Sequence, residues 1–233
     1  VFMLDYIYLT VHTRARMCTV RQKRGEKMVK KENLAELFLN NQGIVSTKKL
    51  NQAGISNYQI QKLLSERKIT RVNRGNYLYN DFYLHDYEII SSLFPEAILY
   101  LESALLLHEY TDRIPNESKI AVGRNMKRDK YRLDFPKINA HYVEEDILEI
   151  GVMEIDSYLD EDDQSNKIVT KLYDKDKTIC DIIKHRNKID QEVFNQAIRN
   201  YIEDNDKNLH HLYQYARKLN IVGLVETYIG VWF

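Results

Sequence analysis

The stretch from Gly43 to Tyr79 constrains the fold of this chain more than any other. It predicts two short helices, over residues 47–53 and 57–66, because each is preceded by a serine, Ser46 or Ser56, that can act as an N-cap. Gly54 lies between them, and a glycine at that place favours the left-handed conformation that ends a helix. In the second helix the spacing i, i+3, i+4 of the apolar residues predicts one buried face; these are Ile60, Leu63 and Leu64.

Two β-prone runs follow, at residues 68–72 and 77–79, and the linking sequence Asn73-Arg74-Gly75-Asn76 is typical of a hairpin turn. Residues 32–41 precede the stretch as a further amphipathic helix, and Ile44-Val45 is expected to add a short edge strand. Helix, glycine turn, helix and hairpin occur in this order in winged helix-turn-helix domains, whose second helix enters the DNA major groove. We therefore predict such a domain over residues 28–80.

The exposed side of the second helix suits base recognition, since it offers Tyr58, Gln61 and Lys62. Between Gly43 and Tyr79 there are seven Lys or Arg and one acid, Glu66, which gives this stretch a net charge of +6. A small helical subdomain with an ordinary solvated basic face is the alternative. The residues predicted to contact DNA are Lys48, Lys49, Asn57, Tyr58, Gln59, Gln61, Lys62, Lys68, Arg71, Arg74 and Asn76.

Charge is segregated along the 233 residues, although the total is zero. Counting Lys and Arg against Asp and Glu, residues 1–27 carry 6 minus 2 and residues 28–80 carry 9 minus 3. Residues 81–166 carry 8 minus 20, and residues 167–233 carry 11 minus 9. The basic front is expected to meet nucleic acid and the acidic middle to be repelled by it.

Composition predicts a globular cytoplasmic protein with no membrane partner. The two cysteines, Cys18 and Cys180, match no metal or redox spacing. The apolar run at residues 1–11 is too short to span a bilayer. Residues 1–27 are predicted to be a non-native or disordered extension, because Lys23-Arg24-Gly25-Glu26-Lys27 can be encoded by purines alone, as a ribosome-binding site ahead of a start at Met28 would be. A genuine extension is the alternative.

Residues 81–233 are predicted to form a mixed α/β domain that ends in helices, so the fold class is α+β with an N-terminal winged unit. Helices are expected at 81–94, 102–108, 174–188, 191–202, 209–219 and 222–231. Strands are expected at 97–100, 119–122, 131–135, 139–143, 147–151, 152–155 and 168–172, with a polar loop at 160–166.

From Met28 onward the chain resembles the AbiEi antitoxins of type IV toxin–antitoxin systems, which act in abortive infection, a phage defence. The resemblance is carried by the winged unit and the closing helices, and by three further stretches: Ser103-Ala104-Leu105 with His108, Thr111-Asp112-Arg113-Ile114-Pro115, and Asp174 with Lys177-Thr178 and Asp181. Residues 1–27 have no counterpart in the family pattern.

The resemblance implies a bifunctional protein. Its winged domain would bind an inverted repeat in double-stranded promoter DNA and repress its own operon, with a weak or DNA-induced dimer expected. Its C-terminal domain would counteract a nucleotidyltransferase toxin of the AbiEii type without a stable complex. An antitoxic surface is expected to include His108, Lys177, Thr178 and Asp181. An ordinary i, i+4 pair between Lys177 and Asp181 is the plainer explanation of that spacing.

No enzymatic motif is present: the sequence has no P-loop, GxGxxG, HExxH or GxSxG. No catalytic residue, metal or cofactor is therefore predicted, and the acids after Asp134 (Glu144, Glu145, Asp146 and Glu149) are interpreted as a solvated face. Two alternative functions remain open: a ligand-responsive winged-helix regulator, and an enzyme that reverses toxin damage. A nucleotidyltransferase gene immediately downstream would favour the antitoxin.

Overall fold

The computed structural model of this protein describes residues 29–159 and 166–232, which form an α+β fold with two β-sheets. The predicted extension 1–27, the proposed start at Met28 and all but the last residue of the expected polar loop lie outside the described residues. The chain from Ala35 onward belongs to one compact unit. The domain boundary expected at 80/81 stays a prediction.

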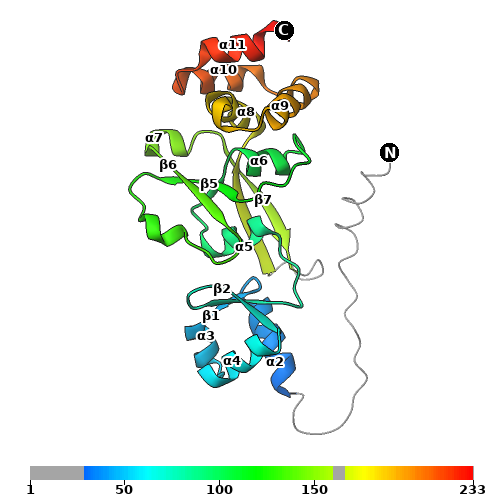
Figure 1. Cartoon of the computed structure of the whole chain (residues 1–233), viewed down its shortest axis with the longest axis vertical. Helices are drawn as coiled ribbons and strands as arrows, with labels where there is room; N and C mark the ends of the chain where they lie inside the picture. Colours follow the sequence, from blue (N-terminus) through cyan, green and yellow to red (C-terminus); the bar gives the residue numbers. More distant parts are fainter. Residues whose placement is uncertain (1–28, 160–165, 233) are drawn as a thin grey trace, which may run out of the picture. The chain divides into compact units, whose positions relative to one another are not determined.

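The N-terminal elements follow the predicted order, with small shifts at their ends (Figure 1). They are α2 (Val29–Leu39), β1 (Ile44–Ser46), α3 (Thr47–Gln52), α4 (Asn57–Ser65), β2 (Ile69–Asn73) and β3 (Asn76–Tyr79). The three strands form an antiparallel sheet in the order β1-β3-β2. Ser46 and Ser56 cap α3 and α4 as predicted, and Gly54 between them has a φ of +82°.

Side chains from these elements are buried against one another and against later parts of the chain. Phe38 of α2 is fully buried, and its ring stacks on that of Tyr79 with 5.3 Å between the centroids. Ile44 and Val72 lie in one hydrophobic cluster with Ile89 and Ile168, which come from far along the sequence. The first sheet therefore shares part of its core with the region that follows it.

The second sheet has five strands in the order β6-β5-β4-β8-β7. Its strands are β4 (Ile98–Leu99), β5 (Ser118–Gly123), β6 (Ile138–Val143), β7 (Val152–Tyr158) and β8 (Lys167–Tyr173). β5 pairs with β6, and β4 with β8, in parallel, whereas β4–β5 and β7–β8 are antiparallel. α5 (Asp86–Leu93) and α6 (Glu102–Leu107) belong to the same region.

Three predicted elements of this region differ from the structure. The helix expected at 81–94 begins only at Asp86, because the Glu88 carboxylate accepts a hydrogen bond from the backbone N–H of His85 and fixes the helix start there. The strand expected at 131–135 is wrong: a 3₁₀ turn, η1 (Arg128–Tyr131), comes first, and the N–H groups of Asp134 and Phe135 then donate to the Val72 carbonyl in β2.

The strand expected at 147–151 is also wrong, since α7 (Glu145–Leu148) ends inside it and a turn follows at residues 149–151. Two acids open this helical turn, where the helix dipole favours negative charge, and Leu148 is buried. Gly151, with a φ of +71°, then reverses the chain into β7.

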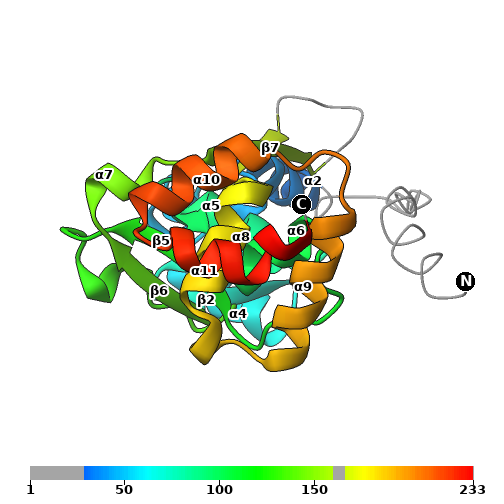
Figure 2. The ribbon, with the colours of Figure 1, turned by 90° about the horizontal axis from the view of Figure 1, so that it is seen from above.

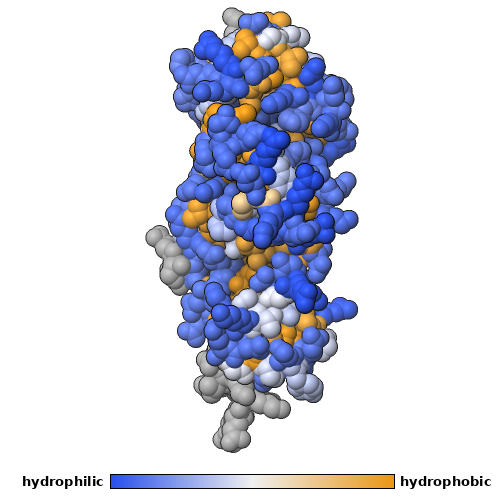
Figure 3. All heavy atoms as spheres, turned by 90° about the vertical axis from the view of Figure 1, so that its left-hand side faces the viewer, coloured by the Kyte–Doolittle hydropathy of each residue, from blue (hydrophilic) through white to orange (hydrophobic). Residues whose placement is uncertain are grey.

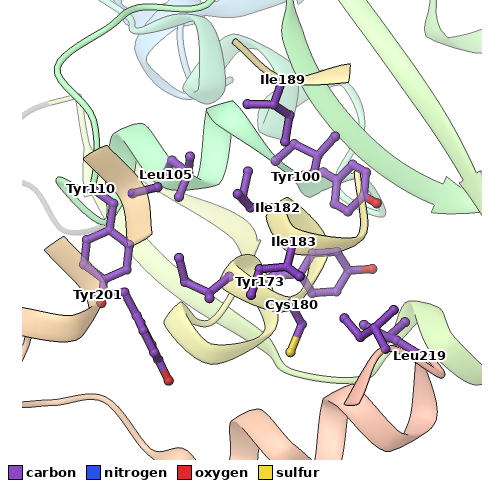
Figure 4. Packing of buried hydrophobic residues seen from close by; sticks show 14 of the residues in the cluster. Tyr100, Leu105, Tyr110, Tyr173, Cys180, Ile182, Ile183, Ile189, Tyr201 and Leu219 are labelled. Carbon is purple, nitrogen blue, oxygen red and sulfur yellow. The ribbon is translucent and has the colours of Figure 1, made fainter. Parts of the chain in front are cut away.

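Four helices close the chain and pack together, as Figure 2 shows from above. They are α8 (Lys175–Lys184), α9 (Gln191–Glu203), α10 (Leu209–Lys218) and α11 (Val222–Tyr228), with short 3₁₀ turns η3 (Arg186–Lys188) and η4 (Gly230–Trp232). α8 is the central one, since eight of its residues are buried. Figure 4 shows Cys180, Ile182 and Ile183 of α8 among aromatic side chains that include Tyr173 and Tyr201.

Asp204, just after α9, ties these helices to the region around α6. Its carboxylate lies 2.7 Å from the Lys175 ammonium and accepts a hydrogen bond of 2.5 Å from the Tyr110 hydroxyl. Burial by itself raises the pKa of Asp204, but the hydrogen bonds from Lys175 and Tyr110 outweigh it and hold that pKa at about 2.

We expect Asp204→Asn to lower the free energy of unfolding by about 1 kcal/mol at pH 7. A depressed carboxyl pKa stabilises the fold above the unfolded-state value near pH ~4, and this contribution is lost as the pH falls toward about 2. The difference between variant and parent should therefore shrink steadily as the pH falls from 7 to 2.5, as measured by urea unfolding. Asp206→Asn is the matched control, because Asp206 is exposed and 3.5 Å from the same ammonium; an equal, pH-dependent loss there would contradict the assignment.

Hydrophilic side chains dominate the face of the molecule in Figure 3, with smaller apolar patches between them. None of the helices in the described part of the chain has both the length and the apolar character needed to cross a membrane.

Candidate nucleic-acid interface

The start of α4 is fixed by a reciprocal pair of hydrogen bonds. The Ser56 hydroxyl accepts from the Gln59 backbone N–H at 3.3 Å, and the Gln59 side-chain carbonyl accepts from the Ser56 N–H at 2.8 Å. This capping box satisfies two of the N–H groups that a helix start leaves without intrahelical partners. Gln59 was predicted to contact DNA; its side-chain oxygen belongs to the cap, so only its amide NH2 group is left for such a contact, which stays a prediction.

The outward side of α4 carries the side chains that the sequence placed there. Ile60 is buried on the inner side, whereas Asn57, Gln61 and Lys62 are exposed, and the Tyr58 side chain is 80% exposed. An exposed tyrosine offers both an apolar ring and a hydroxyl to a partner, since neither is used in packing within the described part of the chain. The helix therefore presents a phenol, an amide and an ammonium group side by side.

The β2–β3 hairpin is held against the start of α3. The Gly75 carbonyl at its tip accepts from the Thr47 backbone N–H at 2.7 Å and from the Thr47 hydroxyl at 3.2 Å. Gly75 itself has a φ of +95°, a conformation that side-chain-bearing residues rarely adopt. Sequence reasoning missed the role of Thr47, because the contact spans 28 residues and leaves no periodic signal.

Two arginines of the hairpin point into solvent. Arg74 is exposed in the turn, and Arg71 is exposed on β2, where its Nε donates to the Asn73 carbonyl at 3.1 Å. Asn76 is half-buried and donates to the Asn73 side chain at 2.8 Å, so its amide stabilises the turn. Asp134 comes within 3.9 Å of Arg71, which brings one acid of the predicted DNA-avoiding middle beside the hairpin.

Some of the lysines predicted to contact DNA already have partners in the protein: one acidic side chain pairs with two of them, and an amide accepts a hydrogen bond from a third. The Glu66 carboxylate pairs with Lys68 and lies 3.8 Å from the Lys62 ammonium. Lys49 of α3 donates to the Asn41 side chain, and Lys48 is exposed. Exposed ion pairs of this kind contribute at most about 1 kcal/mol, so phosphate oxygens can compete for these lysines.

The four residues predicted to form an antitoxic surface lie mostly in the interior, and that prediction is wrong as a description of a surface. Lys177, Thr178 and Asp181 are buried in α8, and His108 is half-buried beside it. The Tyr173 carbonyl accepts from His108 Nε2 at 2.7 Å and from the Thr178 hydroxyl at 3.1 Å. Burial lowers the pKa of His108, and this hydrogen bond opposes the shift.

Lys177 and Asp181 form a buried ion pair of 2.6 Å across one turn of α8. The Lys177 ammonium also lies 4.1 Å from the centre of the Tyr173 ring, as a cation–π contact. Burial raises the pKa of Asp181, and the adjacent Lys177 ammonium opposes that shift. The i, i+4 spacing seen in the sequence thus corresponds to an interior pair.

In the described residues, no three His, Cys, Asp or Glu side chains come close enough together to hold a metal ion. Of the acids from Glu144 to Glu149, Glu145 and Asp146 open α7, and Glu144 and Glu149 flank it; all four are exposed, and Glu144 pairs with Arg124.

No protein-family model matches this chain, and no curated protein matches it.

Proposed function

We propose that residues 28–80 form a winged helix-turn-helix that binds double-stranded DNA, with α4 in the major groove. The observation that carries this proposal is the exposed trio Tyr58, Gln61 and Lys62 on a capped helix. Amide and ammonium groups recognise the major-groove edges of adenine and guanine, and the Tyr58 ring can pack on a thymine methyl group. The β2–β3 hairpin is the wing in this assignment.

The other basic side chains hold the phosphate backbone in this proposal. Lys48, Lys49 and Lys68 lie on or beside α3 and β2, and Arg71 and Arg74 lie on the wing. Such contacts position the protein and supply most of its sequence-independent affinity. The tie between Thr47 and Gly75 supports a fixed geometry, because it connects the tip of the wing to the helix–turn–helix.

We expect affinity for promoter DNA to fall steeply with salt. Neutralising about four to six phosphates gives a slope of about −4 to −5 in a plot of log K against log salt concentration. Fluorescence anisotropy with a labelled promoter duplex between 50 and 300 mM KCl measures this slope. A flat dependence would count against the proposed face.

We further propose that the protein is a type IV antitoxin, which represses its own operon and counteracts a nucleotidyltransferase toxin. The resemblance of residues 28–233 to AbiEi antitoxins supports this role. The test is co-expression with a nucleotidyltransferase of the AbiEii type, encoded immediately downstream if the proposal is right: growth should be restored, and purified toxin and antitoxin should not co-elute. Growth arrest despite equal expression of both proteins would exclude the antitoxin role.

A ligand-responsive regulator is the second candidate, and one feature of the α/β region favours it. An open groove of about 670 Å³ is lined by Glu102, Arg113, Glu117, Lys119 and Lys137, among others. Glu102 Oε2 is buried there, and no hydrogen-bond partner for it is present among the described residues. Charged side chains of both signs line the groove, so a zwitterionic metabolite such as an amino acid is the class of ligand that fits it. Thermal-shift screening with amines and amino acids, with Glu102→Gln as control, separates this candidate from the antitoxin.

A further inference from the structure

β6 forms one edge of the five-stranded sheet, and β5 is its only strand neighbour in the described structure (Figure 1). All six of its residues are half-buried. Its sequence, Ile-Asn-Ala-His-Tyr-Val, contains no Lys, Arg, Asp or Glu. An edge strand without charge is a template for pairing with another strand.

The opposite edge of the sheet is protected differently. β7 carries Glu154 and Asp156, and the Asp156 carboxylate lies 2.8 Å from the Lys167 ammonium. Charged side chains on an edge strand disfavour pairing with another chain. The two edge strands of this sheet therefore differ in side-chain charge: β7 is charged and β6 is not, so only β6 is suited to pair with another strand.

The hydrogen bonds between β5 and β6 show which backbone groups remain available. The Lys137 carbonyl accepts from the Ser118 N–H, and the Val143 carbonyl accepts from the Arg124 N–H. Successive residues of a strand direct their backbone groups to opposite sides, so the odd-numbered residues of β6 face β5. Ile138, Ala140 and Tyr142 therefore direct their N–H and C=O groups to the open edge.

We propose that β6 pairs with β6 of a second copy of this chain, antiparallel and centred on Ala140. In this register Ala140 faces Ala140 of the second copy, and each Ile138 lies opposite Tyr142 of the second copy. The small side chain lets the strands approach at the two-fold axis, and β-branched residues opposite aromatic ones are favourable cross-strand pairs. The two sheets become one continuous sheet of ten strands, since each copy contributes five.

Charge at the two ends of β6 identifies a second copy as the occupant of this edge. Lys137 precedes the strand, and the acidic run Glu144-Glu145-Asp146 follows it. Antiparallel pairing about Ala140 brings Lys137 of each copy beside the acidic run of the other, twice by symmetry. Glu144 of this run already pairs with Arg124, and Glu145 lies against Gly123 of β5, so the exposed Asp146 is the acid on which the charge argument rests. Parallel pairing would instead place like charges together, so the charge pattern selects the antiparallel arrangement.

This inference does not rest on DNA binding, and its test uses the free protein. Ala140→Cys in the full chain, with Cys18 replaced by serine, should form a disulfide-linked dimer under mild oxidation, because self-paired residues fall within the Cα distances that a disulfide spans. Met153→Cys on β7 is the matched control for the other edge, and Cys180 is buried in both proteins. Equal dimer yields from the two variants, or none from Ala140→Cys, would overturn the proposal.

Charge reversal tests the register without touching the core. Lys137→Glu should weaken the dimer about tenfold in sedimentation equilibrium, because it turns two attractions into two repulsions. Adding Asp146→Lys to the same chain should restore the dimer. Both positions are exposed, so circular dichroism should stay unchanged. A dimer that is insensitive to Lys137→Glu would overturn the antiparallel arrangement and the proposal with it.

Discussion

Lys177→Met is expected to destabilise the protein by about 3–5 kcal/mol at pH 7.5, because it leaves the Asp181 carboxylate buried without its counter-charge. Both side chains are almost fully buried, and the ammonium is the one cation within 4.0 Å of the Asp181 carboxylate among the described residues. Methionine keeps the length of the lysine side chain, so the loss of packing is small. Chemical unfolding followed by circular dichroism measures the effect.

The pH dependence of this variant distinguishes a lost charge from a lost contact. Without Lys177, the pKa of Asp181 in the folded protein should rise further above its unfolded value. A group whose folded pKa is raised costs stability only above its unfolded pKa, so the variant should recover stability as the pH falls from 7.5 toward 5. A loss that is independent of pH would contradict the buried ion pair.

The double variant Lys177→Met, Asp181→Leu is the control for this experiment. Replacing a whole buried ion pair with apolar residues of similar volume is often neutral or stabilising, so most of the lost stability should return. The same pair of variants corrects the expected antitoxic role. A single change that abolishes rescue from the toxin, together with a double variant that restores it, would show that Lys177 and Asp181 support the fold of α8 and do not contact the toxin.

The triple variant Tyr58→Ala, Lys62→Ala, Arg74→Ala is expected to lose at least ~100-fold in affinity for promoter DNA and to abolish repression. A lost base-reading contact costs about 1–3 kcal/mol, and a lost phosphate contact weakens binding to all sequences. The three side chains are exposed, so stability should change by about 0.5 kcal/mol or less per site. Gel-shift titration and a promoter reporter measure the two effects.

The matched control is Tyr83→Ala, Lys184→Ala, Arg217→Ala, which removes the same three residue types from exposed positions outside the proposed interface. It should bind DNA as the parent protein does. The triple variant Tyr58→Ala, Lys62→Ala, Arg74→Ala should still rescue cells from the toxin, because we assign that activity to residues 81–233. If it is folded and yet loses both activities, neutralisation would run through DNA binding, and the proposed separation of functions would be wrong.

Local sequence signals predicted the elements whose causes are local. Ser46, Ser56 and Asp174 each cap the helix that follows them, and Gly54 and Gly75 adopt the positive φ values that their turns need. These features depend on residues within one helical turn or one hairpin, so they can be recognised without knowledge of the rest of the chain. The exposed side of α4 followed from the 3.6-residue period in the same way.

Features that depend on residues far away in the sequence could be seen only in the tertiary structure. The apolar residues at 131–135 resemble a strand, but the N–H groups of Asp134 and Phe135 bond to Val72 in another sheet. Lys177 and Asp181 have the spacing of an ordinary surface pair, and only the packing of α8 against other parts of the chain, among them the Tyr173 ring and the distant Gly151, buries them.

The edge position of β6 is a further case, since strand order is a property of the whole sheet. The sequence predicted a strand at 139–143, which the structure has as β6, but it could not show which strands end the sheet. Capping and periodicity act over a few residues, whereas burial and strand order are set by residues tens of positions away. That difference in range is why the sequence determined the short helices α3 and α4 and the β2–β3 hairpin, and why only the folded chain revealed the buried ion pair and the uncharged edge.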